Sequence, residues 1–539
     1  MKTIKCLVLG SAAGLFAISG ARAADLPVKA KAVEYVRICS RYGAGFFYIP
    51  GTDTCIKLGG YLRADVTING GVYDFPFYNG EGAIRDRYAN FYTDRSRVAL
   101  TVDTRTATEY GVVRTFGQAG FSFGPFNYTS SIGLAASVNP GATAGLVNND
   151  TSDNGYVGVE TVFLQFAGFT FGKSFSAFSS PWHGYPGNNT SFLIGGFDSV
   201  TGVNNVQYSW QFGNGVSATI GADDSSANAF NRTQIINAVG GAAGINGGVV
   251  TGGAGGNIGF SGAASAFVTG VGTAYGGSSV PDFVGNIRVD QAWGLFQISG
   301  AVHDNHAAYF NNANDVATTF NFGQNQAGAV NFGHPNDVYG GAVSAALQIK
   351  NIPTGAGDDI KMDASWSRGA SKYTLGTSGA DPSSFDILNG TRFAMGVVTD
   401  AIYSGISPNN GNPQTVVRSN HNWDPYWSSS LFGGITGLSY NQTAKTLYCN
   451  TYVVNAGVPI KGGGVTHGGG TGGVFNPAIS SCDPGFAVSE IGMVTRWTPV
   501  KNLAFSAEVL YAPHELYLRE QRHRFAQPAR SAELLIPIA

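Results

Sequence analysis

Apolar and polar side chains alternate over residues 56–68, in the stretch IKLGGYLRADVTI. Apart from a glycine, the even-numbered positions are apolar from Ile56 to Ile68, whereas the odd-numbered positions carry polar or charged groups, including Lys57, Arg63 and Asp65. A period of two predicts a β-strand with one apolar and one polar face. A strand of a soluble sandwich would show the same pattern, so this stretch alone does not identify the solvent of its apolar face.

The alternation returns throughout the chain, with short turns and long polar connections between the segments. No intervening pattern predicts helices that could cover the apolar faces, so lipid is the solvent that fits them. Asn214-Gly215, between two alternating segments, is a strong hairpin signal. The sequence therefore predicts an all-β protein, a transmembrane antiparallel β-barrel. Its strands are predicted at residues 56–68, 95–104, 109–118, 161–166, 169–175, 206–212, 216–220, 283–290, 295–303, 338–350, 359–368, 414–423, 427–440, 487–497 and 503–511.

The composition agrees with a large barrel. Only 12% of the residues are charged, and the chain contains 77 glycines and 35 phenylalanines. Low charge with abundant glycine and aromatic residues suits an antiparallel barrel better than an α/β enzyme. Beyond the first residues, we find no run of about eighteen apolar residues that could span a bilayer as a helix. Such a protein would cross a membrane with strands.

The first 23 residues have the features of a secretory signal peptide. Lys2 and Lys5 are followed by the apolar stretch 6–18 and by Ala21-Arg22-Ala23, a small-x-small cleavage site. We therefore expect export and removal of residues 1–23. Loss of the three basic residues would change the formal net charge from −2 to about −5, which argues against nucleic-acid binding.

Four cysteines would remain in the exported chain: Cys39, Cys55, Cys449 and Cys482. An even number in an exported protein suggests two disulfides. The pairing between sequence neighbours joins Cys39 to Cys55 and Cys449 to Cys482, although three connectivities are possible. We expect no metal ion at these cysteines, because neither pair has zinc-ligand spacing.

Four blocks of the sequence resemble the porins of alphaproteobacteria: EYVRICSRYGAGFFYIPGTDTCIKLGGYLRAD (34–65), VDTRTATEYGVVR (102–114), VFLQFAGFTFGKS (162–174) and RWTPVKNLAFSAEV (496–509). The resemblance implies a sixteen-stranded, multi-pass barrel in the bacterial outer membrane. It also implies a homotrimer, in which each subunit lets small hydrophilic molecules and ions diffuse through a water-filled channel. No enzyme activity and no cofactor are expected.

The resemblance also divides the chain. An N-terminal segment with a disulfide loop would occupy residues 24–54, and the porin barrel residues 55–511. In general porins, the loop after the fifth strand folds into the lumen and sets an acidic edge opposite a basic wall. By position that loop is 176–203, and its only carboxylate is Asp198.

The candidate site of a porin is its constriction, where rings of charged side chains set selectivity. We predict Arg63, Arg97, Arg105 and Arg114 for the basic wall and Asp198 for the acidic edge, although the alternation leaves the direction of Arg114 open. Each of these residues could instead merely line a wide lumen or pair with a neighbour, as Arg63 could with Asp65. Further residues with inward parity are Lys57, Asp65, Asp103, Arg288, Asp290, Lys361, Asp363 and Glu508.

The tail at residues 512–539 differs from the rest of the chain. It carries seven charged residues in 28, together with Pro513, Pro528 and Pro537, which oppose a central strand. About fifteen strands are recognisable before it, whereas a closed barrel of this type needs an even number. The tail also lacks the terminal aromatic residue of similar porins. One hypothesis is that a shifted reading frame near Leu510 replaced the last loop and strand; the alternative is a divergent but working end.

Three other functions compete with a diffusion porin. An adhesive or binding barrel would use the Gly-rich loops, and an assembly-defective porin would follow from the altered tail. An outer-membrane enzyme would need a catalytic constellation, but His183, His303, His306 and His334 lie in or beside different loops without recognisable nucleophile spacing. We therefore predict an outer-membrane porin that interacts with lipid, small solutes and ions.

Overall fold

The structure, a computed structural model, describes most of the predicted strands and parts of the connections. The described residues are 37–68, 84–85, 92–123, 155–182, 196–197, 201–226, 233, 235–237, 275–307, 334–354, 357–375, 384–389, 392–403, 414–426, 429–448, 485–500, 502–515 and 524–538. The predicted signal peptide lies outside them, as do Asp198, Cys449 and Cys482.

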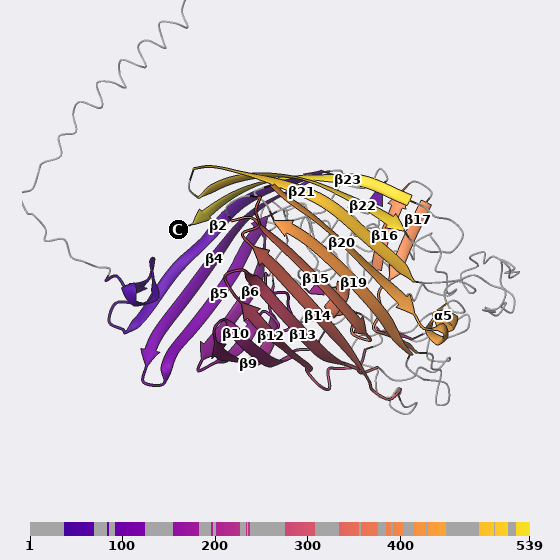
Figure 1. Cartoon of the computed structure of the whole chain (residues 1–539), viewed down its shortest axis with the longest axis horizontal. Helices are drawn as coiled ribbons and strands as arrows, with labels where there is room; N and C mark the ends of the chain where they lie inside the picture. The colour runs from indigo at the N-terminus through magenta and orange to yellow at the C-terminus, as the bar shows by residue number, and fades with distance from the viewer. Residues whose placement is uncertain are drawn as a thin grey trace, which may run out of the picture.

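Sixteen antiparallel strands pair successively into a ring (Figure 1). The ring closes because β2 pairs with β4 on one side and with β23 on the other. The strands are β2 (Thr54–Ile68), β4 (Tyr92–Thr108), β5 (Gly111–Phe123), β6 (Gly155–Phe166), β7 (Phe169–Ser174), β9 (Val203–Gly213), β10 (Val216–Asp223), β12 (Asp282–Asp290), β13 (Gly294–Asn305), β14 (Val338–Lys350), β15 (Asp359–Arg368), β19 (Gln414–Tyr426), β20 (Ser429–Tyr440), β21 (Phe486–Val500), β22 (Leu503–Glu515) and β23 (Arg524–Ile538).

Short and long connections alternate around the ring, as the sequence predicts. Residues 167–168 join β6 to β7 in a tight turn, whereas residues 175–202 form the long connection from β7 to β9. In the hairpin between β9 and β10, Asn214 and Gly215 adopt positive φ angles of 51° and 73°, which Asn and Gly tolerate best. We call the two ends of the ring the short-turn side and the long-loop side.

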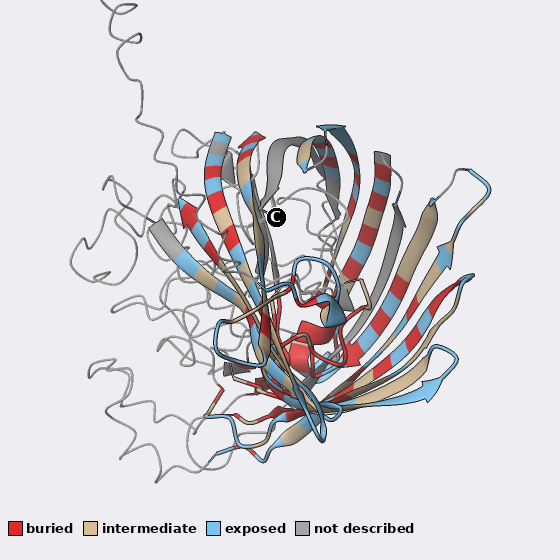
Figure 2. Cartoon of the chain, turned by 90° about the vertical axis from the view of Figure 1, so that its left-hand side faces the viewer, coloured by how far each residue is buried: buried red, intermediate tan, exposed pale blue. Residues whose placement is uncertain are grey.

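Buried and exposed residues alternate along the strands (Figure 2). In β2, the outward side chains of Leu58, Leu62 and Val66 are 55%, 41% and 47% exposed, whereas the inward side chains of Asp65 and Thr67 are buried. An apolar exterior with a polar interior is the pattern of a barrel whose outer face contacts lipid. None of the helices that the structure describes is long and apolar enough to cross a membrane.

The N-terminal segment packs against the start of β2. A disulfide joins Cys39 to Cys55, with Cα atoms 6.1 Å apart, which confirms one of the two expected disulfides. The two cysteines and Phe46 form a small buried cluster beside the 3-10 helix η1 (Ser40–Tyr42) and the short strand β1 (Phe47–Tyr48). The disulfide therefore ties this segment to the barrel wall.

The count of fifteen strands is corrected by β23, which the atypical tail supplies. Its residues Arg530 to Ile538 pair with β2, and its other edge pairs with β22. Both flanking strands need a hydrogen-bonding neighbour, because an open sheet edge is costly in lipid. Pro528 and Pro537 lie within this strand and have no backbone N–H to donate. The strand nevertheless pairs with both of its neighbours. How the tail sequence arose stays a hypothesis.

Short elements occupy the long connections. They are β3 (Ile84–Arg85), β8 (Gly196–Phe197), β11 (Ile235–Asn237), α4 (Lys372–Leu375), β16 (Ser384–Asn389), β17 (Arg392–Val397), β18 (Ala401–Tyr403) and α5 (Gln442–Tyr448). Some enter the ring, where the buried α4 is visible in Figure 2. Phe178, Phe197 and Tyr373 form the aromatic centre of a buried cluster that also includes the wall residues Val284 and Ala301. The interior of the ring is thus partly filled from the long-loop side.

Candidate functional site: the channel lumen

Arginine residues gather on the inner face of β2, β4 and β5. Strand register places Arg63 opposite Arg97 and Arg105 opposite Arg114. Like charges directly opposite one another destabilise a sheet unless carboxylates lie between them. The structure provides three such carboxylates, which divide the basic wall into three groups.

The first group is centred on Asp65. Its carboxylate accepts hydrogen bonds from Arg63 Nε at 2.8 Å and from Arg95 Nε at 2.6 Å. Asp65 and Arg95 are both buried, so the ion pair is screened less by water than a surface pair would be. The sequence allowed Arg63 either to pair with Asp65 or to act on solutes, and the structure shows the pair.

The second group joins Arg97 to Glu160, a residue that the sequence analysis missed. Arg97 forms an ion pair with Glu160, and Gln118 donates a hydrogen bond to the same carboxylate. The register between β5 and β6 shifts beside Gln118, so Glu160 has no direct partner on β5. Gly120 leaves room for the guanidinium, because a Cβ there would lie 2.7 Å from Arg97 Nη2.

The third group lies nearer the short-turn side and is centred on Asp103. Arg105 and Arg114 donate to Asp103 Oδ2 at 3.0 and 3.1 Å. Arg114 also donates to Gln165 at 3.0 Å, so its direction, which the alternation left open, is into the lumen. Arg105 packs over the ring of Phe46 at 4.9 Å, which links the wall to the N-terminal segment. Five arginines and three carboxylates leave this side of the lumen with a net positive charge.

Other predicted lumen residues lie elsewhere around the ring. Arg288 and Lys350 both bind Asp290, at 3.1 and 2.6 Å, and Lys361 lies 3.4 Å from Asp359. Lys57 is exposed, with its ammonium 5.9 Å from the centre of the Phe46 ring. The inward residues Asp363, Glu490 and Glu508 are buried on β15, β21 and β22. These carboxylates lie on different strands from the basic wall.

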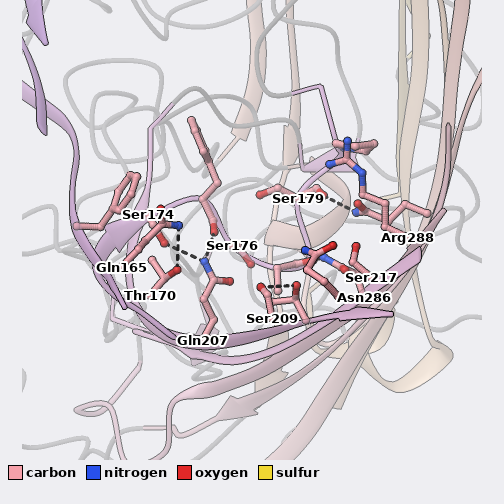
Figure 3. Close-up of a pocket in the computed structure, with 17 residues that line it drawn as sticks. Gln165, Thr170, Ser174, Ser176, Ser179, Gln207, Ser209, Ser217, Asn286 and Arg288 are labelled. Carbon is pink, nitrogen blue, oxygen red and sulfur yellow. Dashed lines mark hydrogen bonds between the residues drawn. The ribbon is translucent and has the colours of Figure 1, made fainter. Parts of the chain in front are cut away.

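Residues 175–182, which we call the folded-in segment, lie inside the ring against the inner face of β9, β12 and β13. Asn286 donates to Ala177 O at 2.6 Å, Gln297 to Ser179 O at 2.7 Å, and Gln207 to Phe175 O at 3.2 Å. Figure 3 shows Asn286 and Gln207 extending from the wall toward this segment. A cavity of about 360 Å³ lies between segment and wall, lined mainly by hydroxyl and amide side chains with Arg288 at one end. The segment occupies the start of the predicted loop 176–203.

A buried hydrogen-bond network holds α4 within the ring. Tyr373 Oη donates to Asp282 at 2.6 Å, and the other oxygen of Asp282 lies 2.7 Å from His303 Nδ1. The second ring nitrogen of His303 lies 2.8 Å from Tyr275 Oη, which donates to Asp400 at 2.8 Å. Phe178 of the folded-in segment packs on the Tyr373 ring, with centroids 4.6 Å apart. The network and the segment therefore support each other.

Besides Glu160, the sequence analysis missed Arg95 and the residues around α4, for different reasons. Arg95 has the same parity as Arg97, so the alternation could have found it. The residues around α4 come from a connection of more than forty residues between β15 and β19, and no local pattern indicates that it folds inward. Asp198 lies outside the described residues, so its place at an acidic edge stays a prediction.

The comparisons with known proteins agree with the strand pattern. Residues 25–529 match the family described as Porin subfamily. Porin Omp2b of Brucella suis biovar 1 (strain 1330) is 37% identical over 229 residues, which are 42% of this chain and 55% of the relative. Porin Omp2b of Brucella canis is 36% identical over the same length. The chain thus spans about half the length of the curated relatives that it matches.

Two solved structures are also similar to this chain. The outer membrane channel DcaP of Acinetobacter baumannii has 13% sequence identity and a TM-score of 0.49, with 91% of this chain and 99% of that chain covered. OprB of Pseudomonas putida has 8% identity and a TM-score of 0.42, with 90% and 94% covered. The family match extends over nearly the whole chain, including the strands that carry the basic wall, and the chain therefore belongs to the Porin subfamily.

Proposed function

We propose that this chain forms a water-filled channel of the bacterial outer membrane, through which small hydrophilic molecules and ions diffuse passively. The observation that carries the proposal is the ring of sixteen antiparallel strands with apolar side chains outside and polar or charged side chains inside. Such a ring satisfies its backbone hydrogen bonds in lipid and leaves a polar path through its centre. Family membership indicates a channel rather than an enzyme.

The constriction of this channel is formed by the basic wall and the folded-in segment. Arg63, Arg97, Arg105 and Arg114 give one side of the lumen positive potential, and their carboxylate partners hold the guanidinium groups in place. Arg105 and Arg114 are 29% and 30% exposed, so their charges face the solvent of the lumen. A charged, narrow, water-filled path selects solutes by size and charge. We expect a preference for anions on the basic side.

We further propose that the channel is a homotrimer, on the basis of the resemblance to alphaproteobacterial porins. Chemical cross-linking of the protein in native outer membranes tests this assembly. Cross-linked species at three times the mass of one chain would support the trimer. Monomers alone, obtained under conditions that cross-link a known trimeric porin, would contradict it.

Planar-bilayer recording tests the channel directly. The mature chain is extracted from outer membranes without heating, and a heat-denatured portion of the same sample is the control. Discrete, stable current steps from the unheated sample alone would support the proposal. Their absence, also in a copy whose residues after Val509 are replaced by an aromatic-ended strand, would overturn it. Steps from the replaced copy alone would identify a porin whose tail prevents assembly.

A further inference from the structure

Two carboxylates and one imidazole converge at the long-loop side of the ring, away from the basic wall. Asp304 lies at the end of β13, His306 directly follows that strand, and Asp337 directly precedes β14. The two strands are paired, with Asp304 opposite Tyr339. The fold therefore brings together residues from both ends of the connection 306–337.

The potential ligand atoms of the three side chains lie close together. One atom from each of Asp304, His306 and Asp337 can be chosen so that all three lie within 4.8 Å of one another. His306 Nδ1 and Asp337 Oδ1 are 2.8 Å apart. In a tetrahedral zinc site, ligand bonds of about 2.0–2.2 Å place neighbouring ligand atoms about 3.4 Å apart. The separations of the three ligand atoms, from 2.8 Å to at most 4.8 Å, lie on both sides of this value.

The environment of Asp304 separately favours a bound cation. Its side chain is only 5% exposed, although it lies at the edge of the barrel. Ser279 donates to Asp304 Oδ2 at 2.5 Å, whereas Oδ1 is buried and has no hydrogen-bond partner among the residues that the structure describes. A buried carboxylate oxygen without a partner is destabilising. A metal ion bound to Asp304 through this oxygen would remove that cost.

We propose that Asp304, His306 and Asp337 bind a divalent first-row transition-metal ion such as Zn²⁺. The imidazole of His306 favours a transition metal, because Ca²⁺ and Mg²⁺ prefer ligand sets made of oxygen alone. Three protein ligands leave a fourth position for water. Nothing in the channel proposal requires this site, and the site does not require the channel to conduct.

Such an ion would fasten several parts of the long-loop side to one another. Gly276 N donates to His306 O at 2.8 Å, and Ser279 contacts Asp304, so the segment before β12 already lies against the site. The metal would add a bond between the end of β13 and the start of β14. Its role is therefore structural, at the base of the connection between these strands.

Metal titration of the purified, full-length mature protein tests the proposal. Isothermal titration with Zn²⁺ alone measures stoichiometry and affinity, and the visible absorption of Co²⁺ reports the ligand geometry. We expect one ion per chain and a loss of at least tenfold in affinity for His306→Gln and Asp337→Asn. His334→Gln is the matched control, because His334 lies three residues before Asp337 in the chain but is not one of the three ligands, and its Nδ1 is 2.8 Å from Pro335 O.

Retained folding is checked by circular dichroism and by resistance to unfolding in detergent. The Asp337 side chain is 36% exposed, so Asp337→Asn should leave the barrel intact. The Zn²⁺ affinity of this variant is therefore a sufficient test of the proposed site. The proposal is overturned by the absence of saturable Zn²⁺ binding, by equal affinity in the folded Asp337→Asn protein and the native chain, or by equal losses in the His334→Gln control.

Discussion

Phe178→Ala should release the folded-in segment while leaving the barrel wall intact. Phe178 is 1% exposed and packs on the rings of Tyr373 and Phe197, with centroid distances of 4.6 and 6.2 Å. Truncation of a buried Phe to Ala typically costs about 3–5 kcal/mol. We use about 3 kcal/mol, because lumen water can fill part of the space. The barrel strands keep their pairing, so the loss acts on the packing of the segment against α4 and Phe197.

A loss of about 3 kcal/mol lowers the ratio of docked to undocked segment by roughly 150-fold. The hydrogen bonds from Asn286 and Gln297 remain and contribute about 1 kcal/mol each. Asn286→Ala alone should therefore change the ratio only about fivefold. Loss of the Phe178 aromatic contact should therefore release the segment more than loss of the hydrogen bond from Asn286 or from Gln297.

Release of the folded-in segment can be measured by single-channel conductance and by liposome swelling with sugars of increasing size. Phe178→Ala should conduct more, flicker more and admit larger sugars than the native chain. Phe121→Ala is the matched control, because Phe121 faces outward on β5, is 49% exposed and lies far along the chain from the segment. Equal conductance and equal sugar exclusion in Phe178→Ala and the native chain would refute the argument that this segment narrows the lumen.

Three further predictions concern the wall, the N-terminal segment and the tail. Arg105→Gln combined with Arg114→Gln removes two lumen charges and leaves Asp103 unneutralised, so the zero-current potential in a KCl gradient should shift toward cations; an unchanged potential would contradict the basic wall. Cys39→Ser opens a loop with a sequence separation of 16, which should destabilise the N-terminal segment by about 3 kcal/mol and speed its proteolysis, while the barrel stays resistant. Deletion of β23 exposes the edges of β2 and β22, so the heat-modifiable barrel band should disappear from gels; a persistent band would show that the ring does not need this strand.

Strand positions were largely predictable because a barrel wall imposes one requirement at every residue. Outward positions contact an apolar environment and inward positions face the lumen, so the alternation is repeated with little dependence on distant partners. The segments predicted at 338–350 and 359–368 coincide with β14 and β15. Ends of strands were less predictable: β4 extends to Thr108, beyond the predicted 104, because pairing with β5 continues to the turn.

The sixteenth strand was missed because its sequence contradicts its pairing. Pro528 and Pro537 remove two backbone donors from β23, and β propensity argues against the strand. Propensity, however, is a local preference of each residue. Without β23, the facing edges of β2 and β22 would leave backbone N–H and C=O groups without hydrogen-bond partners along their length. In lipid each unsatisfied backbone group costs several kcal/mol, so the demand of β2 and β22 exceeds the local cost of the prolines.

The lumen was predictable only as far as strand register determines its contacts. Parity identifies Asp65 as an inward residue, and the β2–β4 register then places it opposite Arg95. The ion pair between Arg97 and Glu160 depends in addition on a one-residue shift between β5 and β6, which alternation cannot reveal. The contact of Tyr373 with Asp282 depends on a connection that folds back across 91 residues. Specific chemistry in this lumen therefore comes from departures from the regular ring, and those departures are the places where mutation should change selectivity without preventing the barrel from forming.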